Sequence, residues 1–324
     1  MRIAVLYSGQ GSPDLLEEAD TVLQMEEVVS TLEQMEHSVQ PLAYGDARET
    51  LIRLKENFDL VFNLVESIEG SDARIYEAAE FFEQLNLPYT GCGARSLRKL
   101  ASKTGQKVIM REHHLPTADF IGVDGVEYLY EADSLKFIVK SDTEHASVGL
   151  DSSCLVDGID EAKSLIALKA AEYGGLWLAE KFVDGREFNI SVLGRPGEPT
   201  RVLPPAEMLF VDYPDHLPKI VDYKAKWEQE SFAYNATVRS FSYPESDREL
   251  LNTLCDLSKR AFELFELSGA ARVDFRVDSK NQPFILEVNA NPCLTSDAGF
   301  MAAAREDGLS AARVLEKLFP VSVS

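Results

Sequence analysis

The sequence has few cysteines, the residues that cross-link small extracellular proteins, and it lacks long apolar runs. Only 4 of its 324 residues are cysteine, and no two are spaced as Cys-x-x-Cys, so neither a disulfide framework nor a zinc site is indicated. No apolar run approaches the roughly 20 residues that a membrane-spanning helix needs. No basic and then apolar segment opens the chain as a signal peptide would. We therefore expect a cytoplasmic protein with no membrane partner.

Positive charge is also scarce. Lys and Arg number 32 against 54 Asp and Glu, which gives a formal net charge of −22. Such a chain is repelled by nucleic acid and by anionic membranes, and we expect neither as a partner. With 45% hydrophobic residues, the chain can bury a sizeable core and form two or three lobes.

Periodicity predicts how the chain is organised. Short apolar runs alternate with helix-like stretches near the N-terminus, which predicts a parallel sheet covered by helices. The strands expected there are 2–7, 39–43 and 58–64, and the helices are 14–36 and 47–55. Further helices are expected at 96–116, 159–173, 243–267, 295–305 and 309–318, and further strands at 137–140, 191–194 and 201–203. Residues 212–235 have poor periodicity.

The clearest chemical signal lies near the C-terminal end. Two runs rich in Val, Ile and Phe flank Lys-Asn-Gln-Pro, which predicts an antiparallel pair of strands joined by a tight loop. Alternation places Arg272, Asp274 and Arg276 on one face of the first strand. It places Glu287 and Asn289 on one face of the second. If these faces meet, two carboxylates and an amide carbonyl can bind Mg²⁺; the alternative is a polar sheet face with an Arg–Asp cross-strand pair.

These two runs carry a resemblance. Arg-Val-Asp-Phe at 272–275, followed by Leu-Glu-Val-Asn-Ala-Asn-Pro at 286–292, resembles the metal-binding end of the ATP-grasp ligases, and within them the D-alanine–D-alanine ligase branch. The resemblance spans most of the chain. It implies an α/β protein with the ATP-grasp fold, in which two α+β lobes hold ATP between them. The implied domains are an N-terminal parallel-sheet domain (1–98), a central lobe (99–183) and a C-terminal lobe (184–324).

The resemblance also implies which residues contact phosphate. Ser102-Lys103 is similar to the family's Asp-Lys step, and Val139-Lys140 begins a block similar to the family's lid over the phosphates, which includes Ser147. Asp222-Tyr223-Lys224-Ala225-Lys226-Trp227 resembles the family's ω-loop, so Lys226 would reach the γ-phosphate. Without the resemblance, the spacing of Lys99, Lys103 and Lys107 by four indicates a solvated basic stripe on one helix.

The stretch from residue 176 to 188 is similar to the family's adenine hinge. The resemblance implies that Glu180 accepts a hydrogen bond from the adenine amino group. Backbone groups near Lys181 and Val183 would read the ring edge, and Glu187 would hold the ribose hydroxyls. An apolar slot with a few convergent polar groups suits a flat base.

The family's reaction follows from the resemblance. ATP activates a carboxylate as an acyl phosphate, and an amine attacks it to form a peptide or amide bond. We expect ATP and two Mg²⁺ ions, with Mn²⁺ as an alternative, bound by Asp274, Glu287 and Asn289. Arg272 and a backbone N–H near Cys293 would stabilise the oxyanion of the second step, with Lys226 acting on the phosphate. We interpret the Cys293 thiol as a small polar filler rather than a nucleophile. Proteins of this family usually form homodimers, so the resemblance implies a possible homodimer.

The substrate pocket departs from the branch. Glu66 stands in place of a histidine, Trp227 in place of the ω-loop tyrosine, and Ala298 in place of the serine that binds the second carboxylate. Ala146 replaces a lid serine, and Pro13 or Asp14 stands where the N-terminal loop has glutamate. We therefore expect amino-acid or peptide substrates other than a pair of D-alanines. A phosphotransferase, a ligase with a non-amine nucleophile and a regulator without turnover are the alternatives.

Overall fold

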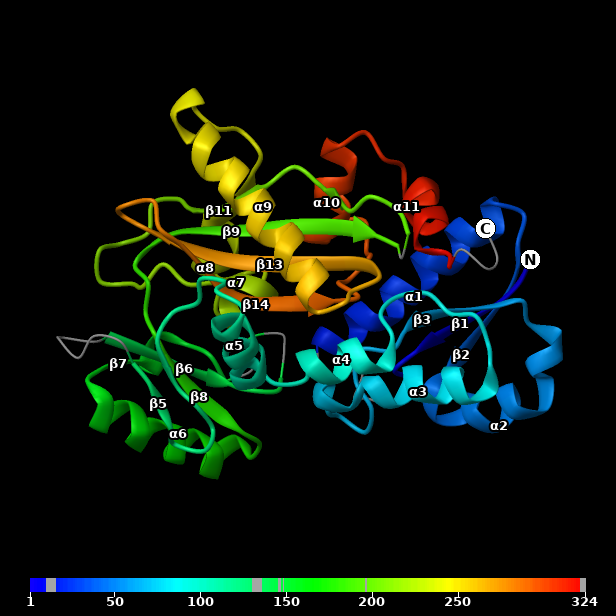
Figure 1. The fold of residues 1–324 in the computed structure, drawn as a ribbon, viewed down its shortest axis with the longest axis horizontal. Helices are drawn as coiled ribbons and strands as arrows, with labels where there is room; N and C mark the ends of the chain where they lie inside the picture. Colours follow the sequence, from blue (N-terminus) through cyan, green and yellow to red (C-terminus); the bar gives the residue numbers. More distant parts are fainter. Residues whose placement is uncertain (10–15, 130–135, 145–146, 148, 196, 321–324) are drawn as a thin grey trace.

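The structure is a computed structural model, shown in Figure 1, and it contains three β-sheets with helices packed around them. The residues that it describes are 1–9, 16–129, 136–144, 147, 149–195 and 197–320. The α/β class expected from the sequence is confirmed. The domain limits 1–98, 99–183 and 184–324 stay predictions. Among the described residues, no helix combines the length and the apolar character needed to cross a membrane.

The first sheet is parallel, as the alternation of strands and helices predicted. Its strands, in the order β2-β1-β3, are β1 (Arg2–Tyr7), β2 (Ser38–Ala43) and β3 (Leu60–Leu64). Its helices are α1 (Leu16–Gln34), α2 (Tyr44–Leu54) and α3 (Tyr76–Leu85). Successive side chains of a strand point to opposite faces, so Ile3 and Val5 pack toward α1 while Ala4 and Leu6 pack toward α2 and α3.

The second sheet is antiparallel and has a core of its own. Its strands, in the order β5-β4-β8-β6-β7, are β4 (Phe120–Ile121), β5 (Glu127–Tyr128), β6 (Lys136–Ser141), β7 (Leu155–Asp157) and β8 (Trp177–Lys181). Helix α6 (Ile159–Tyr173) covers one face. Phe137, Val139 and Trp177 pack against Ala162 of that helix, and no side chain of the first or third sheet belongs to this described core.

The third sheet is the largest and is built around β9 and β13. Its strands are β9 (Gly185–Gly194), β10 (Arg201–Val202), β11 (Ala206–Phe210), β12 (Thr237–Ser240), β13 (Gly269–Asp278) and β14 (Pro283–Ala290). They follow the order β12-β11-β9-β13-β14, with β10 beside β9. Helix α9 (Arg248–Leu264) packs Leu254 and Phe262 on this sheet, as its apolar spacing predicted.

The predicted helix 96–116 is wrong as a single element. Two helices, α4 (Ala94–Leu100) and α5 (Lys103–Glu112), meet at a break around Ser102. The Ser102 backbone is extended, with φ −139°, and its hydroxyl accepts a hydrogen bond from the Gly105 N–H. A side chain that caps a helix in this way competes with continuation of the preceding one. The break makes Lys103 the first residue of α5.

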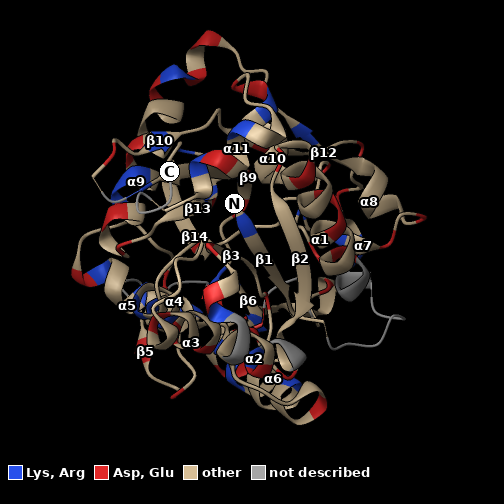
Figure 2. Cartoon of the chain, turned by 90° about the vertical axis from the view of Figure 1, so that its right-hand side faces the viewer, with Lys and Arg blue, Asp and Glu red and all other residues tan. Residues whose placement is uncertain are grey.

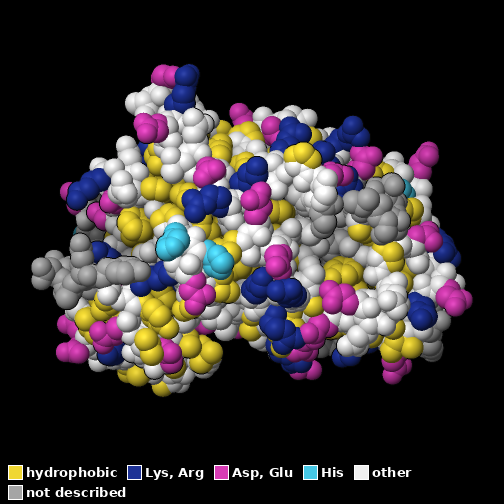
Figure 3. Space-filling model, viewed as in Figure 1, with side chains coloured by type: hydrophobic (Ala, Val, Ile, Leu, Met, Phe, Trp, Pro, Cys, Tyr) yellow, Lys and Arg dark blue, Asp and Glu magenta, His cyan; other side chains and the backbone are white. Residues whose placement is uncertain are grey.

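The first and third sheets share hydrophobic cores. Helices α10 (Gly299–Glu306) and α11 (Ala311–Leu318) pack Phe300 and Val314 against side chains from β1 and β3. Gly91 and Gly269 mark a close approach between the two parts, because a Cβ at Gly91 would lie 2.5 Å from Asn291 Oδ1. The N-terminal and C-terminal parts of the chain therefore form one packed body beside the second sheet. Figure 3 shows an indentation at the lower edge of the view, between the second sheet with α6 and the N-terminal part of the chain.

Several elements were not expected from the sequence. Strand β9 begins at Gly185, six residues before the predicted strand 191–194, and β11 (Ala206–Phe210) was not predicted. The poorly periodic region contains the short helices α7 (Tyr223–Trp227) and α8 (Phe232–Ala236). Single-turn 3₁₀ helices lie at Lys55–Asn57, Asp72–Arg74, Ser152–Cys154 and Glu245–Asp247. Figure 2 shows acidic and basic residues interspersed over the helices of one side.

Candidate active site

A cavity of about 560 Å³ lies between the second and third sheets and reaches α1 and α10. It brings together side chains from segments that are more than 250 residues apart in sequence, as Asp20 and Ala298 illustrate. The predicted site residues that line it are Lys103, Lys140, Ser147, Glu180, Val183, Glu187, Lys226, Arg272, Asp274 and Glu287. The predicted residues Lys181 and Asn289 do not line it but are close neighbours in sequence of residues that do. Their roles stay predictions.

The predicted metal ligands lie together on β13 and β14, and two of them, Asp274 and Glu287, line the cavity. Asp274 and Glu287 are direct partners across the antiparallel pair β13 and β14, and Arg272 lies opposite Asn289. The side-chain nitrogen of Asn289 is 3.1 Å from Asp274 Oδ2 and 3.3 Å from Glu287 Oε1. The two polar strand faces therefore meet, which was the condition for a metal site.

Asp274 is also held by a guanidinium. Arg272 donates from Nε to Oδ1 at 2.7 Å and from Nη2 to Oδ2 at 2.8 Å. Burial opposes the charge of Arg272, but Asp274 raises the pKa of this side chain further above its ordinary value. The Arg–Asp pair considered as the alternative therefore exists, within one strand rather than across two.

The oxygen-bearing side chains here fit a hard cation that takes most of its ligands from water and substrate phosphate. No three His, Cys, Asp or Glu side chains cluster as a complete metal site in the part of the chain that the structure describes. Asp274, Glu287 and Asn289 offer two carboxylates and one amide. Mg²⁺ is characteristically bound by one or two carboxylates together with water and substrate phosphate, so the incomplete protein set is what such an ion requires.

Two lysines approach these carboxylates from other elements. Lys103 Nζ lies 3.4 Å from Glu287 Oε2 and donates to the Glu144 carbonyl at 2.8 Å. Lys226 of α7 lines the cavity. Desolvation and the positive charge of Arg272 lower the pKa of Lys226. Positive charge from two segments thus faces the carboxylate end.

A buried charge cluster lies where the adenine hinge was predicted. Glu180 is 1% exposed and forms ion pairs with Lys107 and with Lys140, whose Nζ is 3.3 Å from Oε1. Burial lowers the pKa of Lys107 to about 8, although Glu180 opposes this. Burial alone would raise the pKa of Glu180, but the two lysines outweigh it and lower the pKa. The solvated stripe expected for Lys99, Lys103 and Lys107 is wrong, because Lys107 is fully buried.

Arg276 connects the hinge to the predicted ribose carboxylate. It donates from Nε to the Val183 carbonyl at 2.9 Å, and its Nη1 is 3.1 Å from Glu187 Oε2. The Lys181 N–H donates to the Asp119 carbonyl at 2.7 Å. Burial raises the pKa of Glu187, and Arg276 opposes that rise. Alternation placed Arg276 on the polar face, but nothing in the sequence gave it this connecting position.

The described part of the predicted lid contacts the ω-loop segment. Ser147 Oγ donates to the Val221 carbonyl at 3.1 Å, and the Tyr223 N–H donates to the Leu150 carbonyl at 3.3 Å. Ser147 itself has φ 61°. The departures at Ala146, Pro13 and Asp14 lie outside the described residues.

Glu66 and Cys293 differ in exposure to the cavity. Glu66 is half-buried and does not line the large cavity; it accepts from Gln24 Nε2 at 2.6 Å. Cys293 lines it, with Sγ 3.3 Å from Asp20 Oδ2. Burial, together with the negative charges of Glu66 and Asp20, raises the pKa of the Cys293 thiol to about 12. A thiol that holds its proton this firmly suits the filler interpretation and not a nucleophile.

The cavity contains an arginine that nothing in the sequence singled out. Arg239 of β12 lines it, as do Trp227 and Ala298. Lys226 Nζ lies 5.8 Å from the centre of the Trp227 ring. Strand β12 spans only four residues, which is too short for alternation to reveal which side chain faces inward.

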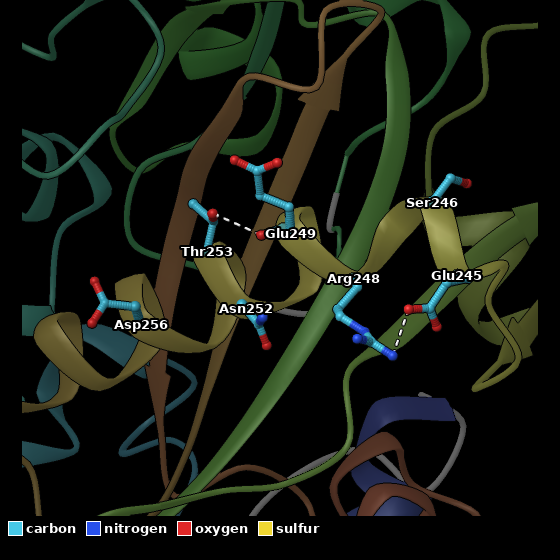
Figure 4. A pocket seen from close by; sticks show the side chains of 7 residues that line it. All are labelled: Glu245, Ser246, Arg248, Glu249, Asn252, Thr253 and Asp256. Atoms are coloured by element: carbon cyan, nitrogen blue, oxygen red, sulfur yellow. Dashed lines mark hydrogen bonds and ion pairs between the residues drawn. The ribbon is translucent and has the colours of Figure 1, made fainter.

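A second hollow, of about 600 Å³, lies on the outer side of α9 and has no comparable chemistry (Figure 4). Arg248 pairs with Glu245, and the Thr253 hydroxyl donates to the Glu249 carbonyl at 2.9 Å. These are contacts within one exposed helix and its first turn. They leave no convergent group of catalytic side chains.

Comparison with known proteins extends these observations. The model of the family described as D-ala D-ala ligase C-terminus matches residues 110–320. A D-alanine–D-alanine ligase of Actinobacillus succinogenes is 30% identical over 276 residues, which cover 83% of this chain and 82% of the relative. D-alanine–D-alanine ligase B of Chromobacterium violaceum is 27% identical over 313 residues, which cover 95% and 93%.

Solved structures show the same fold. The D-alanine–D-alanine ligase from Bacillus anthracis complexed with ATP aligns with a TM-score of 0.74 and 20% identity, over 98% of this chain and 96% of that chain. The ligase from Coxiella burnetii aligns with a TM-score of 0.69 and 18% identity, over 98% and 94%. The predicted ATP-grasp fold is therefore confirmed.

Proposed function

Since the chain belongs to the D-alanine–D-alanine ligase family, we propose that it joins the carboxylate of an amino acid or short peptide to an amine other than that of D-alanine. The general reaction, ATP-dependent joining of a carboxylate to an amine, comes with the family. One observation carries the choice of substrate. Among the residues that line a single cavity, the predicted nucleotide and metal positions keep the family's residues, while Trp227 and Ala298 depart from them.

ATP would bind between the second and third sheets. Lys103, Lys140 and Lys226 would neutralise its phosphates, with Ser147 above them. Glu180 and the backbone near Lys181 and Val183 would hold adenine, and Glu187 would hold the ribose. Lys107 supports this arrangement because, fully buried beside Glu180, it keeps that carboxylate charged and able to accept a hydrogen bond.

Asp274, Glu287 and Asn289 would hold divalent metal. We propose two Mg²⁺ ions, with Mn²⁺ as an alternative. When bound, such ions neutralise charge on the β- and γ-phosphates during transfer. The support is the donor set, since both carboxylates and the amide meet across one pair of strands.

The reaction proceeds in two steps. A carboxylate oxygen of the donor attacks the γ-phosphorus of ATP, and ADP leaves with the electron pair of the broken P–O bond. The acceptor amine then attacks the acyl carbon; the C–N bond forms, the acyl C–O bond to phosphate breaks, phosphate leaves with that electron pair, and the nitrogen loses a proton to solvent. Arg272, together with a backbone N–H near Cys293, would stabilise the tetrahedral oxyanion. Two charge-assisted hydrogen bonds to Asp274 fix the guanidinium plane of Arg272 before substrate arrives.

Family membership favours this ligase over the phosphotransferase, the ligase with a non-amine nucleophile and the regulator. We carry over a homodimer and a cytoplasmic location as further proposals.

The test is an ADP-release assay across amino acids, dipeptides and hydroxy acids. D-alanine is assayed alone with ATP and Mg²⁺, and the dipeptide is sought by mass spectrometry. We expect the best donor and acceptor to be other compounds, because a pocket built to bind one polar group rejects analogues that lack it by as much as about 10⁴-fold. A kcat/KM for D-alanine above about 10⁴ M⁻¹s⁻¹, ordinary for an enzyme on its own substrate, would contradict the proposal.

A further inference from the structure

At the acceptor end of the cavity, Arg239 is a cation whose side chain is not committed to a carboxylate. Among the described residues, its one hydrogen bond runs from Nη1 to the Asp297 carbonyl, at 3.3 Å. No Asp or Glu oxygen lies within 4.0 Å of its nitrogens among the residues that the structure describes. Arg272, which lines the same cavity, instead donates from Nε and Nη2 to Asp274. Arg239 therefore keeps donors that can serve a ligand.

The guanidinium lies beside the start of α10. An ideal Cβ placed on Gly299 would be 3.5 Å from Arg239 Nη2 and 3.8 Å from Cζ. The preceding residue is Ala298, which offers no side-chain hydrogen bond to the helix. This is where the resembling branch has the serine that binds the second carboxylate. A hydroxyl is missing here, and a guanidinium from β12 lies next to the vacant position.

The surroundings of Arg239 favour an anionic ligand. Burial and the charge of Arg272 lower the pKa of Arg239, Arg305 adds to this, and Asp297 opposes it. A desolvated guanidinium near two others is stabilised when a carboxylate arrives, and its planar fork matches a carboxylate in a bidentate fashion. If Arg239 had a purely structural role, that role would depend, among the described residues, on its 3.3 Å hydrogen bond to the Asp297 carbonyl.

We propose that Arg239 binds the free carboxylate of the acceptor substrate, so that the acceptor is an amino acid or peptide with an unblocked C-terminus. The proposal rests on the ligase function proposed above. On this proposal, a guanidinium takes the place of the serine hydroxyl that is absent at Ala298. It also assigns specificity to β12, a strand remote in sequence from the motif residues.

The test pairs each acceptor with its amide. Acceptors found by ADP release are compared with the same compounds amidated at the C-terminus, in the wild type, in Arg239→Met and in Arg239→Lys. A hydrogen-bonded charge pair discriminates by about 10- to 100-fold, so we expect the wild type to show a KM for the acid lower than for the amide by that factor. Arg239→Met should abolish the preference, and Arg239→Lys should retain part of it. The KM for ATP should not change.

Arg305→Met is the matched control. Arg305 is a nearby arginine on α10 that donates to the Ser296 carbonyl and does not line the cavity. We expect it to keep the preference for acid over amide. Equal loss of preference in Arg305→Met and Arg239→Met would indicate a general field effect and overturn the assignment.

A second arm needs no turnover. Binding of D-alanyl-D-alanine, L-alanyl-L-alanine and glycylglycine, each as acid and amide, is measured calorimetrically with ADP and Mg²⁺ present. Acid-selective binding that depends on Arg239 supports the inference even if no member of the ADP-release panel reacts, in which case only the proposed substrates fail. Turnover without acid selectivity leaves the ligase function standing and overturns the role of Arg239. Absence of acid-selective binding in both arms also overturns it.

Discussion

Glu66→Gln tests whether the departure at the histidine position creates a carboxyl group that prefers to be neutral. Glu66 is half-buried, and Gln24 donates to it at 2.6 Å. Burial raises its pKa from the ordinary 4.5 to about 7, with the charges of Asp20 and Asp72 adding to the effect and Lys226 opposing it. Glutamine has nearly the same shape and hydrogen-bonding reach as the protonated acid. The substitution therefore removes the titration and changes little else.

The sign of the effect follows from proton binding. Between pH 4.5 and 7, the folded state holds a proton on Glu66 that the unfolded state has lost. The stability that Glu66 contributes is thus fully present below pH 4.5 and is lost as the pH rises through 7. At about 1.4 kcal/mol for each pH unit, the difference amounts to roughly 3 kcal/mol. Glu66→Gln should match the wild type at low pH and exceed it by up to this amount at pH 8.

The measurement is urea unfolding of wild type and Glu66→Gln from pH 5 to pH 8.5. Glu26→Gln on the exposed face of α1 serves as control, because it removes one acidic residue without changing a buried group. We expect the difference between Glu66→Gln and wild type to grow with pH and the control to show no such growth. A difference that is constant over the pH range would refute the reasoning, since it would mean that Glu66 is ionised at all these pH values.

Two further predictions concern the nucleotide end. ATP with Mg²⁺ at a hundredfold excess over Kd should stabilise the protein by about 2.7 kcal/mol, because the ligand binds only the folded state. Absence of a thermal shift at millimolar ATP and Mg²⁺ would contradict the assignment of Lys103, Lys140 and Lys226. Glu287→Gln should abolish turnover and leave the fold intact, because a hard anionic ligand is lost and the γ-phosphate is misplaced. Activity equal to wild type at limiting Mg²⁺ would rule out the metal site. The control is Glu306→Gln, which is exposed on α10 and should keep full activity.

The carboxylate end of the site could be predicted from local pattern. Two runs with period two and a short turn leave few ways to pair, so Asp274 and Glu287 had to meet once β13 and β14 formed. The parallel N-terminal sheet was predictable for a similar reason, because each strand is followed by its own helix. These features depend on short sequence separations, which the pattern of side chains records directly.

The features that could not be predicted depend on packing between distant segments. Lys107 has the spacing of a surface residue, and its burial follows from the meeting of α5 with Glu180 of β8. Arg239 acquires its position only because β12 adds to the third sheet beside the start of α10. The break at Ser102 was visible as a capping residue, but the lysine spacing around it favoured one continuous helix.

The division of the hydrophobic cores determines which part of the enzyme can open. Side chains of the first and third sheets are buried in common clusters, so separating those two parts would expose both. The second sheet has its own core with α6 and meets the rest through polar contacts, such as the 2.7 Å bond from the Thr104 N–H to Asp142, and a small apolar cluster around Ile138 and Ile220. Motion of this sheet costs the least buried apolar surface. Nucleotide exchange would thus depend on movement of the second sheet, while Arg239, proposed to bind the acceptor, would stay in place on the third sheet.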